Sequence, residues 1–92
     1  MKIAVLLPNH NHAAFIGRAV QAIQRQSHAE WEMAIVDDAS TDDSRQVISA
    51  LARQDGRIVT DFRAERRGAV AALQTCYAMT TAPLVLGTAA DD

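Results

Sequence analysis

The amino-acid sequence predicts an α/β fold, a Rossmann-like open parallel sheet built in the order β-α-β-α-β-α-β by residues 1–92 as one domain. Two observations carry this prediction. Short apolar runs alternate with longer segments in which apolar residues recur every three to four positions, which is the spacing of an amphipathic helix. The first run, residues 3–8, is apolar on both faces, as strands are when helices cover both sides of a parallel sheet. Such alternation predicts right-handed crossovers in one sheet.

Each element has a signal of its own. Pro8 closes the first apolar run, because proline cannot continue an interior strand. Hydroxyl and acidic residues at 39–43 predict a capped start of the second helix with acids in its first turn, and Asp55-Gly56 predicts its end. Gly68 is expected to open the third helix. The expected strands are residues 3–8, 31–36, 57–62 and a fourth that starts at 84–86, and the first helix is expected to reach about Gln26.

Composition and charge exclude several classes of protein. The formal net charge is -2 and the hydrophobic share is 49%, which describes a globular domain without the broad basic surface of a nucleic-acid binder. The arginines at 63, 66 and 67 suffice for one anionic ligand. The longest nearly apolar stretch, residues 82–90, is about half a membrane span, and the first residues lack a signal-peptide pattern. We therefore expect a cytoplasmic protein with no membrane segment in this chain, and Cys76 as a buried small hydrophobe.

Polar residues directly follow three of the expected strands. They are residues 9–11 after the first strand, Asp37-Asp38 after the second and Asp91-Asp92 after the fourth. In an open parallel sheet the carboxyl ends of the strands share one edge, and ligands bind there. Paired carboxylates at that edge can hold Mg²⁺ or Mn²⁺, or accept hydrogen bonds from a base or a ribose. Two alternatives stay open: a helix cap or solvated turn at Asp37-Asp38, and a charged terminus at Asp91-Asp92.

The order of these motifs resembles family 2 of the glycosyltransferases, which have the GT-A fold. Residues 7–11, Leu-Pro-Asn-His-Asn, are similar to the P-x-[YH]-N turn of that family. Residues 35–42, Ile-Val-Asp-Asp-Ala-Ser-Thr-Asp, are close to its V-D-D-x-S-x-D segment and form the most specific match. Residues 66–68 stand where the family has an N-x-G turn before its third helix, and Asp91-Asp92 stand where its D-x-D-D metal motif ends. The resemblance covers the whole chain.

This resemblance implies inverting transfer of a sugar from a nucleoside diphosphate sugar, with uridine diphosphate favoured as the nucleotide. In the family the first-strand turn and the second-strand aspartate contact the base and the ribose, and a divalent metal, Mg²⁺ or Mn²⁺, holds the diphosphate. Asp38 would accept a hydrogen bond from the base. The implied substrate-binding residues are Pro8, Asn9, Asn11, Asp37, Asp38 and Arg67, and the implied metal-binding residues are Asp91 and Asp92.

The chain also departs from the family pattern. Ala89 stands where the first aspartate of the metal motif is usual, and Leu73-Gln74 stands where the third helix often has Arg-Asn. The catalytic base and the acceptor pocket of the family belong to later elements. We therefore expect this chain, as the truncated N-terminal half of a GT-A fold, to bind the donor without transferring the sugar. Its last strand would be an open edge, which predicts self-association.

Two other classes of protein share parts of the pattern. A phospho-acceptor receiver domain also has an acidic pair, but at the end of its first strand and with a later lysine, whereas Lys2 is the only lysine here. A non-catalytic nucleotide-sugar-binding or interaction module is the main alternative, because a base and one metal-site aspartate are missing. His10 and His12 lack a third ligand nearby, and this favours turn residues near a nucleotide over a metal site.

Overall fold

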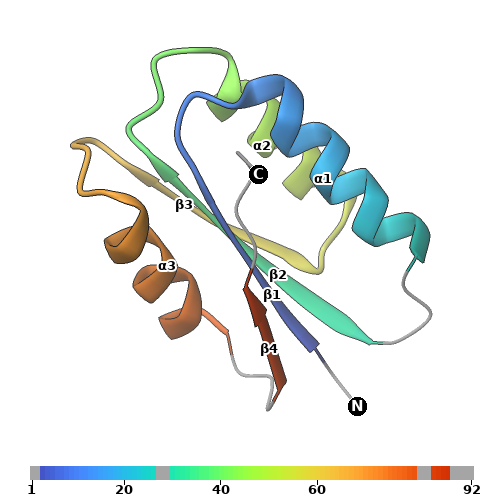
Figure 1. Cartoon of the computed structure of the whole chain (residues 1–92). Coiled ribbons are helices and arrows are strands. Elements are labelled where there is room, and N and C mark those ends of the chain that lie inside the picture. Colours follow the sequence, from blue (N-terminus) through green and yellow to red (C-terminus); the bar gives the residue numbers. More distant parts are fainter. Residues whose placement is uncertain (1–2, 27–29, 81–83, 88–92) are drawn as a thin grey trace.

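The computed structural model describes residues 3–26, 30–80 and 84–87, and these form an open sheet with helices on both faces (Figure 1). All pairs of neighbouring strands are parallel. The elements in chain order are β1 (Ile3–Asn9), α1 (Ala13–Gln26), β2 (Trp31–Asp38), α2 (Ser44–Gln54), β3 (Ile58–Arg63), α3 (Ala69–Ala78) and β4 (Leu84–Gly87). The predicted fold class and element order are confirmed.

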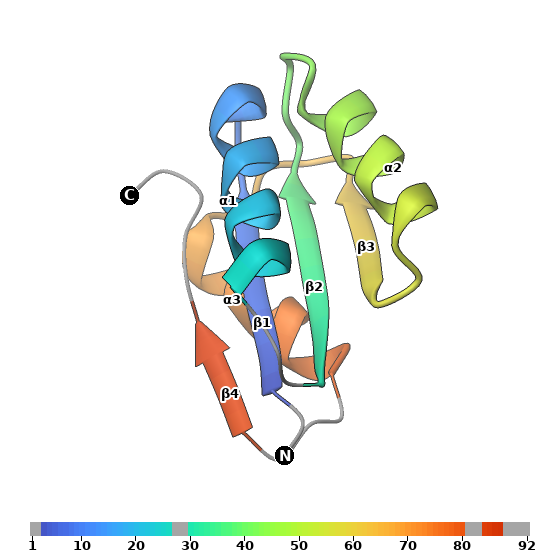
Figure 2. The ribbon, with the colours of Figure 1, turned by 90° about the vertical axis from the view of Figure 1, so that its right-hand side faces the viewer.

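The strand order is β3-β2-β1-β4, so the chain moves outward from β1 in one direction and then returns to the other side of β1. Helices α1 and α2 cover one face of the sheet and α3 covers the other (Figure 2). The strand order therefore reverses at β1, because the crossover from β1 leads to β2 on one side and the crossover from β3 leads to β4 on the other side. Ligands of open α/β sheets bind at the carboxyl end of the strands beside such a reversal.

The core consists of one apolar layer on each face of the sheet. Alternate residues of a strand point to opposite faces, and both faces of β1 and β2 are buried. The layer under α1 and α2 contains Val5, Leu7, Ile16, Val20, Met33, Ile35 and Ile48, and the layer under α3 contains Ala4, Leu6, Ala34, Val36, Ala72 and Cys76. The alanines and Cys76 of the second layer are small, and the Cys76 thiol lies 3.5 Å from the Ala34 carbonyl oxygen. Cys76 is fully buried, as predicted.

Helix α2 begins later than the sequence predicted. It starts at Ser44, and its first turn contains no acidic residue, so the expectation of a helix start within 39–43 was wrong. Asp42 instead accepts a hydrogen bond from the amide of Ser44 at 2.9 Å, and Ala39 has a left-handed φ of 57°. Short polar side chains that bond to nearby amides compete with helix formation. Here they build a loop that delays the helix.

The carboxyl edge of the sheet brings the polar strand ends together. Asn9 is paired with Asp37 in the parallel register, and Asp38 is paired with Arg63. Pro8 and Asp38 therefore lie at the same edge, as predicted. Asp91, the third residue of that prediction, lies outside the described residues.

The opposite edge is held by a separate cluster. The Arg57 guanidinium lies 3.6 Å from the centroid of the Trp31 ring. It also donates two hydrogen bonds to the Asp55 carboxylate, at 2.9 and 2.8 Å, and Gln24 donates a third to the same carboxylate at 3.1 Å. The cluster joins α1, the end of α2 and the starts of β2 and β3, so it stabilises the fold at a distance from the carboxyl edge.

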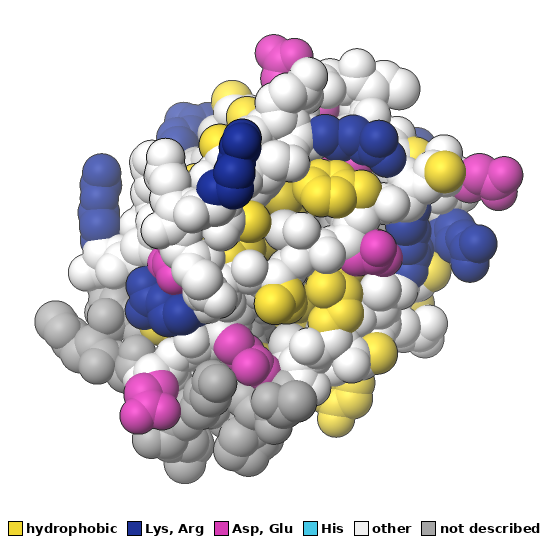
Figure 3. Space-filling model, turned by 180° about the vertical axis from the view of Figure 1, so that it is seen from behind, with side chains coloured by type: hydrophobic (Ala, Val, Ile, Leu, Met, Phe, Trp, Pro, Cys, Tyr) yellow, Lys and Arg dark blue, Asp and Glu magenta, His cyan; other side chains and the backbone are white. Residues whose placement is uncertain are grey.

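The surface mixes both signs of charge. In the face drawn in Figure 3, basic and acidic side chains are interspersed among apolar ones, and the described residues there form no continuous basic patch. None of the helices within 3–26 and 30–80 is long and apolar enough to span a membrane.

Candidate functional site

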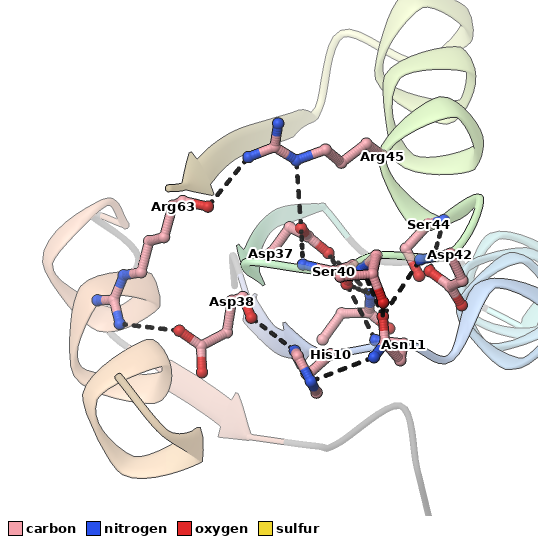
Figure 4. A network of polar contacts seen from close by, with 11 residues as sticks. His10, Asn11, Asp37, Asp38, Ser40, Asp42, Ser44, Arg45 and Arg63 are labelled. Carbon is pink, nitrogen blue, oxygen red and sulfur yellow. Dashed lines mark hydrogen bonds and ion pairs between the residues drawn. The ribbon is translucent and has the colours of Figure 1, made fainter. Parts of the chain in front are cut away.

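Asn11 joins the loop after β1 to the loop after β2 (Figure 4). Its backbone amide donates to the Ser40 hydroxyl at 2.9 Å, and its side-chain carbonyl accepts from the amides of Thr41 at 2.7 Å and Asp42 at 3.3 Å. Its φ of 56° is left-handed, a conformation that asparagine tolerates better than most residues. Asn11 therefore fixes the shape of the carboxyl edge by clamping two loops together.

Asp37 lies on the α1 and α2 side of the sheet and is fully buried. Its carboxylate accepts hydrogen bonds from the Asn9 side chain at 3.0 Å, from the Ser40 amide at 3.0 Å and from the Ser40 hydroxyl at 2.6 Å. Arg45 adds an ion pair at 3.7 Å. Burial removes a carboxylate from water, and such partners offset that cost. The contacts of Asp37 are internal, and they hold the loop that follows β2.

Asp38 points to the other face, toward α3, and is also buried. Its two carboxylate oxygens accept the backbone amides of Arg67 and Gly68, both at 2.8 Å. Gly68 precedes α3 with a φ of 95°, which its lack of a side chain permits. This turn points the two amides toward the Asp38 carboxylate. The side chain of Asp38 thereby anchors the start of α3 to the end of β2.

The charges around Asp38 favour its ionised form. Burial raises the pKa of this carboxyl group. The two amides and the nearby Arg63 and His10 lower it by more, so the net pKa lies below the ordinary 3.8. The ring Nδ1 of His10 lies 2.6 Å from the Asp38 backbone carbonyl and must carry a proton to donate to it. His10 and Asp38 are therefore held side by side at this edge.

A cavity of about 130 Å³ opens beside Asp38 on the α3 face. Its lining residues are Pro8, Asn9, His10, His12, Asp38, Arg66, Ala69 and Ala72. Proline, alanine and imidazole surfaces supply apolar walls, and Asp38 and Arg66 supply charges of opposite sign. The arrangement suits a flat heterocycle with a hydrogen-bond donor and an anionic substituent.

The structure separates the predicted substrate-binding residues into groups. Pro8, Asn9 and Asp38 line the cavity, whereas Asn11 and Asp37 build the loops behind it. Arg67 lines a neighbouring groove of about 540 Å³ together with Asp61, Arg63, Ala64, Glu65 and Thr75.

His10 and Arg66 line the cavity although neither was among the predicted binding residues. The position of His10 within the turn after the first strand was a signal for it. Nothing in the sequence distinguished Arg66 from Arg67, because the bend before α3 decides which arginine faces the cavity.

The predicted metal-binding residues Asp91 and Asp92 lie outside the described residues, as does Ala89. Within 3–26 and 30–80 there is no group of three histidine, cysteine or acidic side chains that could hold a metal ion.

Comparison with known proteins decides the family. The family model for glycosyl transferase family 2 matches residues 4–92. The chain belongs to this family. An uncharacterized glycosyltransferase, alr2836 of Nostoc sp., is 36% identical over the whole of this chain, which spans 29% of that relative's length.

Solved glycosyltransferase structures share the fold. The mannosyltransferase PcManGT from Pyrobaculum calidifontis, in complex with GDP-Man and Mn²⁺, matches 97% of this chain with a TM-score of 0.87 and 29% identity. Glucosyl-3-phosphoglycerate synthase from Mycobacterium tuberculosis, in complex with Mn²⁺, UDP and glucosyl-3-phosphoglycerate, matches 97% with a TM-score of 0.75 and 25% identity. This glycosyltransferase chain corresponds to 27% and 33% of those chains. The GT-A character of the open sheet is thereby confirmed.

Proposed function

We propose that this chain is the donor-binding part of a family 2 glycosyltransferase, and that the cavity beside Asp38 takes the base of a nucleoside diphosphate sugar. The observation that carries the proposal is the position of one buried, ionised carboxylate. Asp38 lies in the wall of a cavity at the carboxyl end of the sheet, next to the reversal of strand order at β1.

The chemistry of the lining supports a base as the ligand. The Asp38 carboxylate has lone pairs beyond the two that accept the amides of the α3 start, so it can accept an N–H of a base. Pro8, Ala69 and Ala72 offer apolar surface to the flat ring, and the His10 imidazole lies beside them. Arg66 provides a cation for the anionic diphosphate. The cavity is open to solvent on one side, so the sugar would extend beyond it.

The nucleotides bound in the two similar structures contain different bases, guanine in the first and uracil in the second. Both bases carry a ring N–H that Asp38 could accept. We favour uridine diphosphate on the resemblance of the motifs, and the experiment below compares the two directly.

A divalent metal, Mg²⁺ or Mn²⁺, is proposed for the diphosphate, with Asp91 and Asp92 as its protein ligands. Carboxylates and phosphate oxygens are the ligands that these hard cations prefer. When bound, the metal would neutralise charge on the departing diphosphate. None of the described residues is assigned as a general base. We therefore propose inverting sugar transfer for the whole protein and donor binding for this chain.

Calorimetry on the 92-residue chain tests the proposal. UDP and GDP should bind weakly without metal, and Mn²⁺ should strengthen binding by about 1–2 kcal/mol of coupling. Asp91→Ala should reduce the metal effect and leave metal-free binding unchanged. Asp43→Ala is the matched control, because Asp43 is exposed near the same edge and caps no amide with its side chain.

Absence of binding for both nucleotides would contradict the proposed function. An Asp91→Ala variant with the full metal response would contradict the metal assignment alone. A whole protein that binds the donor but transfers no sugar would instead support the non-catalytic module.

A further inference from the structure

Arg63 is a nearly buried cation that the base cavity does not include. It is the last residue of β3, and 13% of its side chain is exposed. One end nitrogen, Nη2, donates to the Ala71 carbonyl at 3.0 Å and to the Thr75 hydroxyl, both on α3. The other, Nη1, is buried without a hydrogen-bond partner. Burying a guanidinium is costly unless an opposite charge compensates it.

The compensating charge is the Asp38 carboxylate. The Arg63 Nη1 lies 3.8 Å from Asp38 Oδ1, too far for a hydrogen bond but close enough for an ion pair, and both side chains are largely removed from water (Figure 4). Arg45 supports Arg63 from the other face by donating to its backbone carbonyl at 3.0 Å. Arg63 therefore links Asp38 to α3 through its side chain and to α2 through its backbone.

The charged and titratable groups around Asp38 come from three parts of the chain. Arg63 ends β3, His10 and His12 lie in the loop after β1, and Arg66 lies in the loop before α3. Asp38 is the single acid among the described residues that line the cavity. Arg63 differs from His10 and Arg66 in lying behind the carboxylate, where it lines the neighbouring groove and not the cavity.

We infer that Arg63 is a positioning residue for nucleotide binding. Arg63 keeps the Asp38 carboxylate charged and fixed between β2 and α3, and it does not touch the ligand. The inference rests on the proposed function, in which Asp38 accepts an N–H of the base. If Asp38 were protonated, its O–H would face the amide donors of Arg67 and Gly68. This would strain the start of α3 and would remove one acceptor site for the base.

The pH dependence of binding gives this role a distinct signature. Asp38 binds as the carboxylate, so binding is complete above its pKa and is lost as the pH falls through that value. The Arg63 charge is one of the causes that lower the pKa of Asp38, while burial raises it. Removing the charge raises that pKa, and the loss of binding then begins at a higher pH.

The experiment compares Arg63→Gln with Arg63→Lys in the same chain. Glutamine at this position would keep a hydrogen-bond donor toward α3 without the charge, whereas lysine would keep the charge without the planar guanidinium group and its several donors. Nuclear magnetic resonance of side-chain carboxyl carbons follows the titration of Asp38, and calorimetry between about pH 4 and pH 7 follows the binding of UDP and GDP. We expect Arg63→Gln to raise the pKa of Asp38 and to weaken binding about tenfold near pH 5, which equals about 1.4 kcal/mol. Arg63→Lys should restore the titration.

Arg57→Met is the control, because Arg57 stabilises the opposite edge of the sheet. It should lower the stability without changing nucleotide affinity or its pH profile. An Arg63→Gln variant with the parent's Asp38 titration and affinity would overturn the inference. If that variant does not fold, Arg63→Lys decides alone: its Asp38 must titrate as in the parent, and a raised pKa refutes the inference.

The two proposals fail in different ways. A parent chain that binds neither nucleotide refutes the proposed function, whereas the titration of Asp38 still reports on Arg63. A parent that binds, together with an Arg63→Gln variant that binds equally well across the pH range, refutes the role of Arg63 alone.

Discussion

Replacing Asp38 by alanine tests whether this residue supports the fold as well as the cavity. The substitution leaves the amides of Arg67 and Gly68 without their acceptor, and an unsatisfied buried donor costs about 1–3 kcal/mol. Both bonds are part-buried, so the lower half of that range applies. The expected loss is about 2–4 kcal/mol in the free energy of unfolding, a large share of the roughly 5–15 kcal/mol typical of a domain.

Urea denaturation at pH 7 measures this loss, and Trp31 is a suitable fluorescence probe because it is the only tryptophan and is buried. The folded pKa of Asp38 is lowered, so its contribution is complete above the unfolded value of about 3.9 and declines as the pH falls through the folded value. The difference between the parent and Asp38→Ala should therefore shrink in acid.

Asp43→Ala provides the comparison, since an exposed substitution should change stability by about 0.5 kcal/mol or less. Equal urea midpoints for Asp38→Ala and Asp43→Ala would refute the anchoring role of Asp38. A difference that stays constant down to low pH would refute the assignment of the effect to the ionised carboxylate.

Three further outcomes follow from the contacts. Asp55→Asn should lower the free energy of unfolding at neutral pH, because the Arg57 hydrogen bonds lower the pKa of Asp55. Urea titrations should show that the difference in stability between the parent and Asp55→Asn shrinks as the pH falls toward the lowered pKa. Burial raises the pKa of the Cys76 thiol to about 11, so a thiol reagent at pH 8 should modify it slowly in the folded chain and fast in urea; equal rates would contradict its burial. Asn11→Ala should destabilise more than Asn11→Gly by about 1 kcal/mol in thermal melts, because glycine adopts the left-handed φ of 56° without strain. Identical melts would show that backbone strain at this position is unimportant.

Much of the fold followed from local patterns. The apolar residues of β1 and β2 predicted strands covered on both faces, and the family resemblance of residues 35–42 led to the confirmed family. The start of α2 could not be predicted in this way. Residues 39–43 carry the side chains of a helix cap, but the clamp by Asn11 and the hydrogen bonds of Asp37 stabilise a loop there instead. The Asn11 contacts join residues about 30 positions apart, which local propensity does not include.

For the candidate site, too, the sequence determined some features and the tertiary structure decided the others. The sequence determined that polar and acidic residues lie at the carboxyl ends of the strands, although the structure includes Pro8, Asn9, Asp37 and Asp38 in β1 and β2 themselves. Because parallel strands share a carboxyl edge, the sequence also determined that Pro8 and Asp38 would lie at the same edge. It did not determine what each carboxylate would contact. Adjacent residues of a strand point to opposite faces, so Asp37 supports the loop under α1 and α2 while Asp38 faces α3 and the cavity. The tertiary structure alone assigned the two amides and Arg63 to Asp38, because these partners come from β3 and the start of α3, and only their packing onto the sheet brings them within reach.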